Sequence, residues 1–294
     1  MALNQRGYNL NKITPFSTVF LAAVFFLNST SLAQQGSSVP RPTVKLYNTA
    51  KQKLLDGKQI FSYTVSTFDP ELYCQAATHY DYIWLEMQHS TMTWADLEKM
   101  IATCPGVGVP MIRLPDEFES TLQHATDIGA IGMIEPTVDT VEKAQAVVRY
   151  SKYPPEGRRS QGRSQAPQLW GSFGPYRQTS NDNMLVVLMI ETPVGVANAY
   201  DIARTPGVDV VIAANTDLGN FSGYAPASPE YQDLVKKIHD ATIKAGKFFG
   251  ATDPSYAKGR PDSADFRFLQ NGPSFDGWQP PKRNSVQRSS PTSR

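Results

Sequence analysis

Eight short apolar runs alternate with segments of helical spacing, and this alternation restricts the fold more than any other feature of the sequence. The predicted strands are residues 61–67, 82–86, 109–114, 130–134, 185–190, 208–213, 247–251 and 266–270. Short runs rich in Val, Ile and Leu are typical of parallel strands that are buried on both faces. Strands alternating with helices indicate an α/β fold, and eight of them predict a single (β/α)8 TIM barrel.

The segments between the strands have helical spacing at residues 44–55, 70–78, 93–103, 117–128, 141–151, 195–203 and 228–245. Thr93 and Ser228 are expected N-caps, and Gly246 is an expected helix stop. A long polar segment, 153–183, interrupts the pattern. The connection 255–264 is short and contains glycine and proline, so the C-terminal end of the barrel is predicted to be short or degenerate.

The N-terminal residues have the order and spacing of a secretory signal peptide. Basic residues precede the apolar run 16–27, and Ser31 and Ala33 provide the small residues of a cleavage site before Gln34. We therefore predict a signal peptide over 1–33 and export to the periplasm or the medium. A retained membrane anchor is the alternative, although spanning a bilayer takes about 20 apolar residues.

The remaining sequence is divided by composition. Residues 34–42 are polar and Pro-rich and are expected to form a linker, 43–278 the catalytic barrel, and 279–294 a disordered tail. With 28 basic and 27 acidic residues, the chain has no charge excess that would favour nucleic acid. No second stretch is apolar enough to span a membrane, so the mature protein is expected to have no membrane span.

The two cysteines, Cys74 and Cys104, are expected to be free. Cys74 comes early in one predicted helix and Cys104 just after the next. Because neighbouring barrel helices are parallel, this places the thiols towards opposite ends, beyond the distance of about 7 Å between Cα atoms that a disulfide requires.

Four polar residues lie at the ends of predicted strands or shortly after them, at the carboxyl rim where TIM barrels carry their active sites. They are His89, Arg113, Glu191 and Asp217. Two carboxylates on neighbouring strands suit a hard divalent cation, with an adjacent base and a fixed positive charge. Each residue also has a structural alternative: a structural histidine, a surface ion pair, or a cap on the following helix. No Cys or His spacing favours zinc.

Several segments, in this order, resemble the HpcH/HpaI aldolase/citrate lyase family. They cover about residues 60–250 and read YDYIWLEMQHS, MIRLP, DIGAIGMIEPTVDTVEKA, RYSKYPPEGRRSQG, LMIETPVGVANAYDIA and VDVVIAANTDLGNFSGY. The resemblance implies a (β/α)8 barrel of the phosphoenolpyruvate/pyruvate-domain type. It also implies a class II aldolase that joins or cleaves a 2-oxoacid and an aldehyde through a metal-bound enolate, and a homo-oligomer, commonly a hexamer.

The family resemblance also assigns roles to individual residues. Glu191 and Asp217 would bind the divalent cation, Mg²⁺, Mn²⁺ or Co²⁺. Arg113 would bind the keto oxygen of the substrate, and the backbone around Thr216 and Asp217 would hold its carboxylate. His89 would act in proton transfer and would be oriented by Asp127.

The sequence departs from the family pattern beside several of these residues. Gln88 stands where an acidic residue usually precedes the histidine, and Glu86 replaces the aspartate three positions before it. Met189 replaces a glutamine near the metal-binding glutamate. Asn215 and Thr216 stand where Gly-Pro usually precedes the second metal ligand.

The leading functional hypothesis is therefore a metal-dependent carbon–carbon lyase acting on pyruvate or a similar 2-oxoacid. One alternative is a non-catalytic 2-oxoacid-binding or metal-binding protein on a degenerate barrel, and another is a related lyase or decarboxylase acting on oxaloacetate-like acids. The loop arginines Arg158, Arg159 and Arg163 either contact an acidic substrate tail or belong to an ordinary solvated loop.

Overall fold

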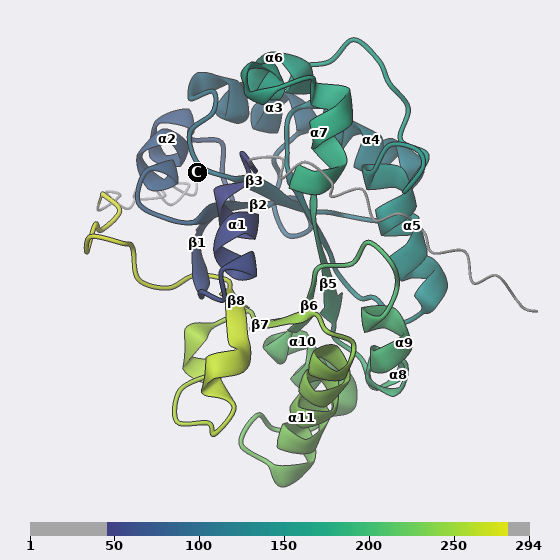
Figure 1. Cartoon of the computed structure of the whole chain (residues 1–294). Helices are drawn as coiled ribbons and strands as arrows, with labels where there is room; N and C mark the ends of the chain where they lie inside the picture. The colour runs from purple at the N-terminus through teal and green to yellow at the C-terminus, as the bar shows by residue number, and fades with distance from the viewer. Residues whose placement is uncertain (1–45, 282–294) are drawn as a thin grey trace, which may run out of the picture. The chain divides into compact units, whose positions relative to one another are not determined.

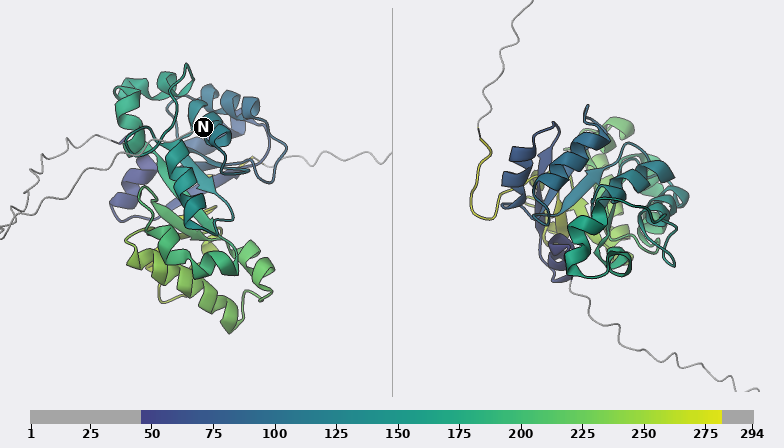
Figure 2. Two further views of the ribbon diagram at one scale, coloured as in Figure 1. Left: turned by 90° about the vertical axis from the view of Figure 1, so that its right-hand side faces the viewer. Right: turned by 90° about the horizontal axis from the view of Figure 1, so that it is seen from above.

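A computed structural model describes residues 46–281 of the chain. Its eight strands pair in sequence order, all parallel, and β8 returns to β1 to close a barrel (Figures 1 and 2). The strands are β1 (Ile60–Val65), β2 (Tyr82–Glu86), β3 (Pro110–Arg113), β4 (Gly132–Glu135), β5 (Leu185–Ile190), β6 (Val210–Ala213), β7 (Phe248–Ala251) and β8 (Phe266–Leu269). The predicted (β/α)8 barrel is confirmed. The predicted signal peptide, the linker and tail residues 282–294 lie outside the described residues.

Helices separate the strands from β1 to β7 and surround the barrel (Figure 2). They are α1 (Thr49–Leu55), α2 (Pro70–Ala77), α3 (Trp94–Thr103), α4 (Glu119–Asp127), α5 (Val141–Ser151), α6 (Ala166–Trp170), α7 (Tyr176–Asn183), α8 (Pro193–Ala197), α9 (Ala199–Ala203), α10 (Asn215–Ser222) and α11 (Pro229–Lys244). Thr93 and Ser228 are N-caps as predicted, since each side chain accepts a hydrogen bond from a first-turn amide. None of these helices is long and apolar enough to cross a membrane.

The helix pattern differs from the prediction at three places. The polar segment 153–183 contains α6 and α7, whose short lengths give little periodicity to detect. The predicted helix 195–203 is divided at Asn198 into α8 and α9. Helix α10 was not expected, because it begins directly after β6 on residues interpreted as a strand end.

Strand register directs alternate side chains to the interior of the barrel. Arg113 on β3 pairs in register with Glu86 on β2 and Ile134 on β4, so the three side chains share the inner side. Below them, Met111 fills the interior opposite Gly132, where an added Cβ would lie 2.4 Å from the Met111 Cε atom. This packed interior supports a site at the carboxyl rim.

The expectation of two free cysteines is wrong, because Cys74 and Cys104 form a disulfide with Cα atoms 5.8 Å apart. Helix α2 has only eight residues, so Cys74, its fifth residue, lies about one turn from the C-terminal end as well as from the start. Cys104 is the C-cap of α3, which packs against α2. Both thiols therefore lie at the same end of adjacent parallel helices.

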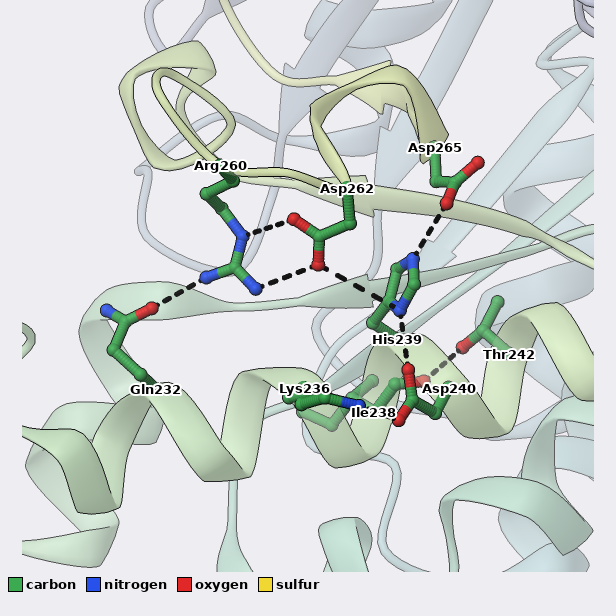
Figure 3. A network of polar contacts seen from close by, with 9 residues as sticks. All are labelled: Gln232, Lys236, Ile238, His239, Asp240, Thr242, Arg260, Asp262 and Asp265. Carbon is green, nitrogen blue, oxygen red and sulfur yellow. Dashed lines mark hydrogen bonds and ion pairs between the residues drawn. The ribbon is translucent and has the colours of Figure 1, made fainter.

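A polar network attaches α11 to the connection between β7 and β8 (Figure 3). The His239 ring lies 2.9 Å from Asp240 through Nδ1 and 3.1 Å from Asp265 through Nε2. Arg260 donates two hydrogen bonds to Asp262 and one to Gln232. The short connection 255–264 contains no α-helix. Its regular parts are two 3₁₀ turns, Pro254–Tyr256 and Ser263–Asp265, and the network holds the second turn through Asp265.

After β8 the described chain forms no further helix and runs along the outside of the barrel towards α2 (Figure 1). The Trp278 ring stacks on His79, with centroids 4.9 Å apart, and Asp276 accepts from His79 Nδ1 at 2.9 Å. The predicted short C-terminal end is observed in these described residues, and aromatic stacking attaches them to the barrel.

Glu135, the last residue of β4, is fully buried, and register directs its side chain away from the barrel interior. Lys143 Nζ lies 3.1 Å from Glu135 Oε1 and 3.5 Å from Glu117. Burial raises the pKa of Glu135 from 4.5 to about 8, although Lys143 opposes the rise. The folded protein therefore holds a proton that the unfolded chain releases, and its stability falls as pH increases from 4.5 to about 8.

Replacing Glu135 by Gln is expected to remove this dependence. Between pH 5 and pH 8, the free energy of unfolding of the wild-type protein should fall by about 2–4 kcal/mol more than that of Glu135→Gln. Urea denaturation at both pH values measures the difference. Glu117→Gln is the control, because Glu117 also contacts Lys143 but is partly exposed. Parallel pH curves for wild type and Glu135→Gln would contradict the assignment.

Candidate active site

A pocket of about 300 Å³ opens at the carboxyl rim of the barrel. Its lining comes from the ends of six strands or the residues just after them: His89, Arg113, Met189, Ala214, Thr216, Asp217, Thr252 and Gln270. Four of the residues predicted from strand ends therefore belong to this pocket or contact its lining, since Glu191 lies against Arg113. The site is assembled by the barrel from residues far apart in the sequence.

Arg113 is the centre of the site and lies among three carboxylates. Its Nη1 atom is 3.5 Å from Glu86 Oε2, and its Nη2 atom is 3.4 Å from Glu191 Oε1 and 4.0 Å from Asp217 Oδ2. The Arg113 and Glu191 side chains are buried, whereas the Asp217 side chain is 39% exposed. The guanidinium is thus fixed in orientation, with one carboxylate open to the pocket.

Glu86, the last residue of β2, is a site residue whose role was not predicted. Its Oε2 atom accepts a hydrogen bond from Trp84 Nε1 at 3.0 Å, and its Oε1 atom accepts one from the backbone N–H of His89 at 3.0 Å. Glu86 therefore joins Arg113 to the loop that carries His89. Its spacing from His89 was the signal in the sequence, but the three partners are visible only in the fold.

Glu191 is held on its other side by Thr137. The Thr137 backbone N–H and hydroxyl both donate to Glu191 Oε2, at 2.7 and 2.6 Å. Burial raises the pKa of Glu191 above its ordinary value, and the Asp217 carboxylate adds to the rise, whereas the Thr137 hydroxyl and Arg113 lower it. A positive charge in the pocket would therefore favour the ionised form of Glu191.

Thr216 and Asp217 lie in the first turn of α10, which starts immediately after β6. The N-cap is Ala214, which has no side-chain oxygen to accept hydrogen bonds from the first amides. Backbone amides and the helix dipole at such a terminus favour an anionic ligand. The predicted location of a substrate carboxylate near Thr216 and Asp217 is compatible with this geometry.

The structure does not bring Asp127 to this pocket, so the predicted orientation of His89 by Asp127 does not occur in the described chain. Asp127 is the last residue of α4, outside the barrel wall. Its carboxylate accepts hydrogen bonds from Gln123 at 2.7 Å and from Arg159 at 3.0 Å. It lines a separate cavity, whereas Glu86 accepts a hydrogen bond from the backbone N–H of His89.

The loop arginines also lie away from the site. Arg158 pairs with Glu119 at 3.1 Å, and the buried Arg159 pairs with Asp127. Arg163 lines the same separate cavity as Asp127. Within residues 46–281, none of the three lines the Arg113 pocket, so the interpretation as substrate-contacting residues is not supported in this chain.

The residues around Arg113 fit a divalent cation by charge and by donor type. No group of three or more His, Cys, Asp or Glu side chains is close enough to hold a metal by itself among residues 46–281. However, three carboxyl groups lie against one guanidinium in a largely buried site, so the site has an excess of two negative charges when all three are ionised. Carboxylate oxygens are the ligands that Mg²⁺ prefers, usually one or two of them with water or substrate.

The fold and this pocket define a (β/α)8-barrel protein with an arginine-centred acidic site at its carboxyl rim. Residues 65–259 match the HpcH/HpaI aldolase/citrate lyase family, and the chain belongs to it. The 2-keto-3-deoxy-L-rhamnonate aldolase of Salmonella gallinarum is 31% identical over 220 residues, which is 72% of this chain and 82% of that protein.

Further comparisons agree with this family. The hydroxypyruvate/pyruvate aldolase of Chromohalobacter salexigens is 31% identical over 193 residues, covering 63% of this chain and 74% of that protein. A solved HpcH/HpaI aldolase/citrate lyase family protein from Burkholderia cenocepacia has the same fold, with a TM-score of 0.69 and 24% identity over 76% of this chain and 92% of that one. The chain is thus a carbon–carbon lyase by family.

Proposed function

We propose that this protein is a divalent-metal-dependent class II aldolase that forms or cleaves an aldol between pyruvate, or a similar 2-oxoacid, and an aldehyde. The observation that carries the proposal is the convergence of Arg113, Glu191 and Asp217 in one pocket beside His89. The aldolase names of the relatives at about 30% identity support the same reaction class.

In the cleavage direction, the substrate is a 4-hydroxy-2-oxoacid. Its hydroxyl loses a proton, the bond between C3 and C4 breaks, and the electron pair of that bond remains on C3. Conjugation with the keto group moves negative charge to the keto oxygen, and an aldehyde leaves. Arg113 presents its guanidinium to this developing charge. Because Glu86 and Glu191 already orient the guanidinium, it does not have to reorganise during the reaction.

His89 is the proposed proton carrier. It lines the pocket, and Glu86 fixes its backbone N–H. Histidine can accept and return protons near neutral pH, so it suits the transfer between the substrate hydroxyl and the pocket. Protonation at C3 then converts the enolate to pyruvate and completes the cycle.

Glu191 and Asp217 are the residues that would hold the cation, Mg²⁺, Mn²⁺ or Co²⁺. Such an ion would supply Lewis-acid stabilisation of the negative charge that develops on the substrate. The first-turn amides of α10 would bind the same carboxylate from the protein side. The neutral residues Thr252 and Gln270 complete the lining of the pocket.

Exchange of the pyruvate methyl protons tests the proposal without knowledge of the aldehyde. The purified protein in D₂O is expected to exchange these protons with Mg²⁺ or Mn²⁺ present and to stop on addition of EDTA, as followed by proton NMR. Pyruvate binding without exchange in the Mn²⁺-loaded protein would contradict an aldolase and favour the binding-protein alternative. Rapid release of CO₂ from oxaloacetate without any aldol product would favour the decarboxylase alternative.

We also propose that the chain is exported. The N-terminal pattern of basic, apolar and small residues supports this. The Cys74–Cys104 disulfide supports it independently, because disulfides persist mainly in oxidising compartments.

A further inference from the structure

Thr137 has a backbone conformation that threonine rarely adopts. It follows β4 in the sequence Glu135-Pro136-Thr137 and has a φ of +50°, in the left-handed region. A β-branched residue is disfavoured there, and a conformation of this kind persists only where the surrounding structure imposes it. An observed outlier beside a buried site residue is a reason to look for a functional constraint.

The neighbouring residues hold the loop of Thr137 against the end of β5. The backbone N–H of Val138 donates to the Met189 carbonyl at 2.9 Å. Asp139 accepts from the Thr192 hydroxyl through its side chain, and from Asn198 Nδ2 at 2.7 Å through its backbone carbonyl. Three contacts to the β5–α9 region therefore fix the turn on the element that carries Glu191.

The left-handed turn directs both donors of Thr137 at one oxygen. The backbone N–H and the hydroxyl lie 2.7 and 2.6 Å from Glu191 Oε2, while Glu191 Oε1 faces Arg113 at 3.4 Å. The two carboxylate oxygens thus have separate partners. Glu191 is 1% exposed, so water cannot readily replace a lost donor.

We propose that Thr137 is a positioning residue, which binds Glu191 Oε2 through two hydrogen bonds so that Oε1 is the oxygen presented to the pocket and to its cation. The inference rests on the proposed function for the cation itself. Its basis is the geometry of one strained residue and one carboxylate. A residue with this role acts on metal affinity through Glu191, without touching substrate.

Three substitutions at Thr137 separate positioning from stability. Thr137→Val removes the hydroxyl but keeps the shape, the backbone N–H and the strain. Thr137→Ser keeps the hydroxyl. Thr137→Gly removes the hydroxyl and also relieves the strain, because glycine adopts positive φ freely. Titration calorimetry with Mn²⁺ should show affinity about 10-fold weaker in Thr137→Val and Thr137→Gly, because loss of a hydrogen-bond partner of a metal ligand typically costs 10- to 100-fold in affinity. In Thr137→Ser the affinity should stay within about 2-fold of wild type.

Thr140→Val is the matched control, because Thr140 lies in the same loop and its hydroxyl caps α5 without contacting Glu191. It should lower the thermal midpoint and leave Mn²⁺ affinity unchanged. A crystal structure of metal-free Thr137→Val should show the Glu191 carboxylate rotated from its wild-type position. Unchanged affinity in Thr137→Val, an equal loss in Thr140→Val, or an unmoved Glu191 would each overturn the positioning role. Absence of Mn²⁺ binding by the wild-type protein would instead overturn the proposed function, while the crystal structure still tests the position of Glu191.

Discussion

Glu191→Gln and Asp217→Asn are each expected to weaken Mn²⁺ or Mg²⁺ binding by at least about 100-fold and to stop pyruvate proton exchange. An amide offers a neutral oxygen in place of a charged one, and each variant removes one of the two negative charges in excess over Arg113. In Glu191→Gln the loss is compounded, because the amide must fit between Thr137 and Arg113 in a buried position. Calorimetric titration of each purified variant measures the affinity directly.

His89→Ala is the informative control for these variants. His89 lines the pocket but does not contact Glu191 or Asp217 in the described hydrogen bonds and ion pairs, so metal affinity should stay within about 3-fold of wild type while aldol cleavage falls by about 10²–10⁴. If both carboxylate variants bind Mn²⁺ as tightly as wild type, the cation site lies elsewhere. If His89→Ala loses metal binding as completely as they do, His89 belongs to that site and its role as proton carrier is wrong.

The double substitution Cys74→Ala/Cys104→Ala is expected to lower the free energy of unfolding by about 3–4 kcal/mol. The disulfide joins residues 30 positions apart, and its main effect is to restrict the unfolded chain. It also ties the C-terminal end of α2 to that of α3, which are adjacent in the barrel. Urea denaturation of oxidised wild type and of the double variant gives the difference.

Two further results are expected if the disulfide is present. Wild type unfolded in the presence of reductant should match the double variant, because only the cross-link distinguishes them. Alkylation of unreduced, denatured wild type should modify neither cysteine. Modification of both thiols in protein recovered from outside the cytoplasm would refute the disulfide and remove its support for export.

Local sequence was sufficient for the strands and for the rim residues. Each strand is a short apolar run of its own, so β5 and β6 were recognisable from residues 185–190 and 208–213 alone. Arg113, Glu191 and Asp217 come at the ends of such runs, and parallel strands bring their carboxyl ends to one rim. Their convergence therefore follows from the topology alone.

Short or irregular elements were harder to predict. Helices α6, α8 and α9 have five residues each, too few for a helical period to be distinguished from a loop. In the β7–β8 connection, the turn Ser263–Asp265 and the residues just before it depend on His239 and Arg260, whose carboxylate and amide partners come from two separate segments (Figure 3). Tertiary contacts stabilise these parts, so their local sequence carries little signal.

The sequence by itself determined the barrel and the set of polar residues at its rim, because both follow from the periodicity of nearby residues and from the topology of parallel strands. Only the tertiary structure decided the partners of those residues. It pairs Asp127 with Arg159 rather than with His89, joins Cys74 to Cys104, and places Thr137 against Glu191. Such contacts depend on helix lengths, loop conformations and side-chain directions, which a position in the sequence does not specify.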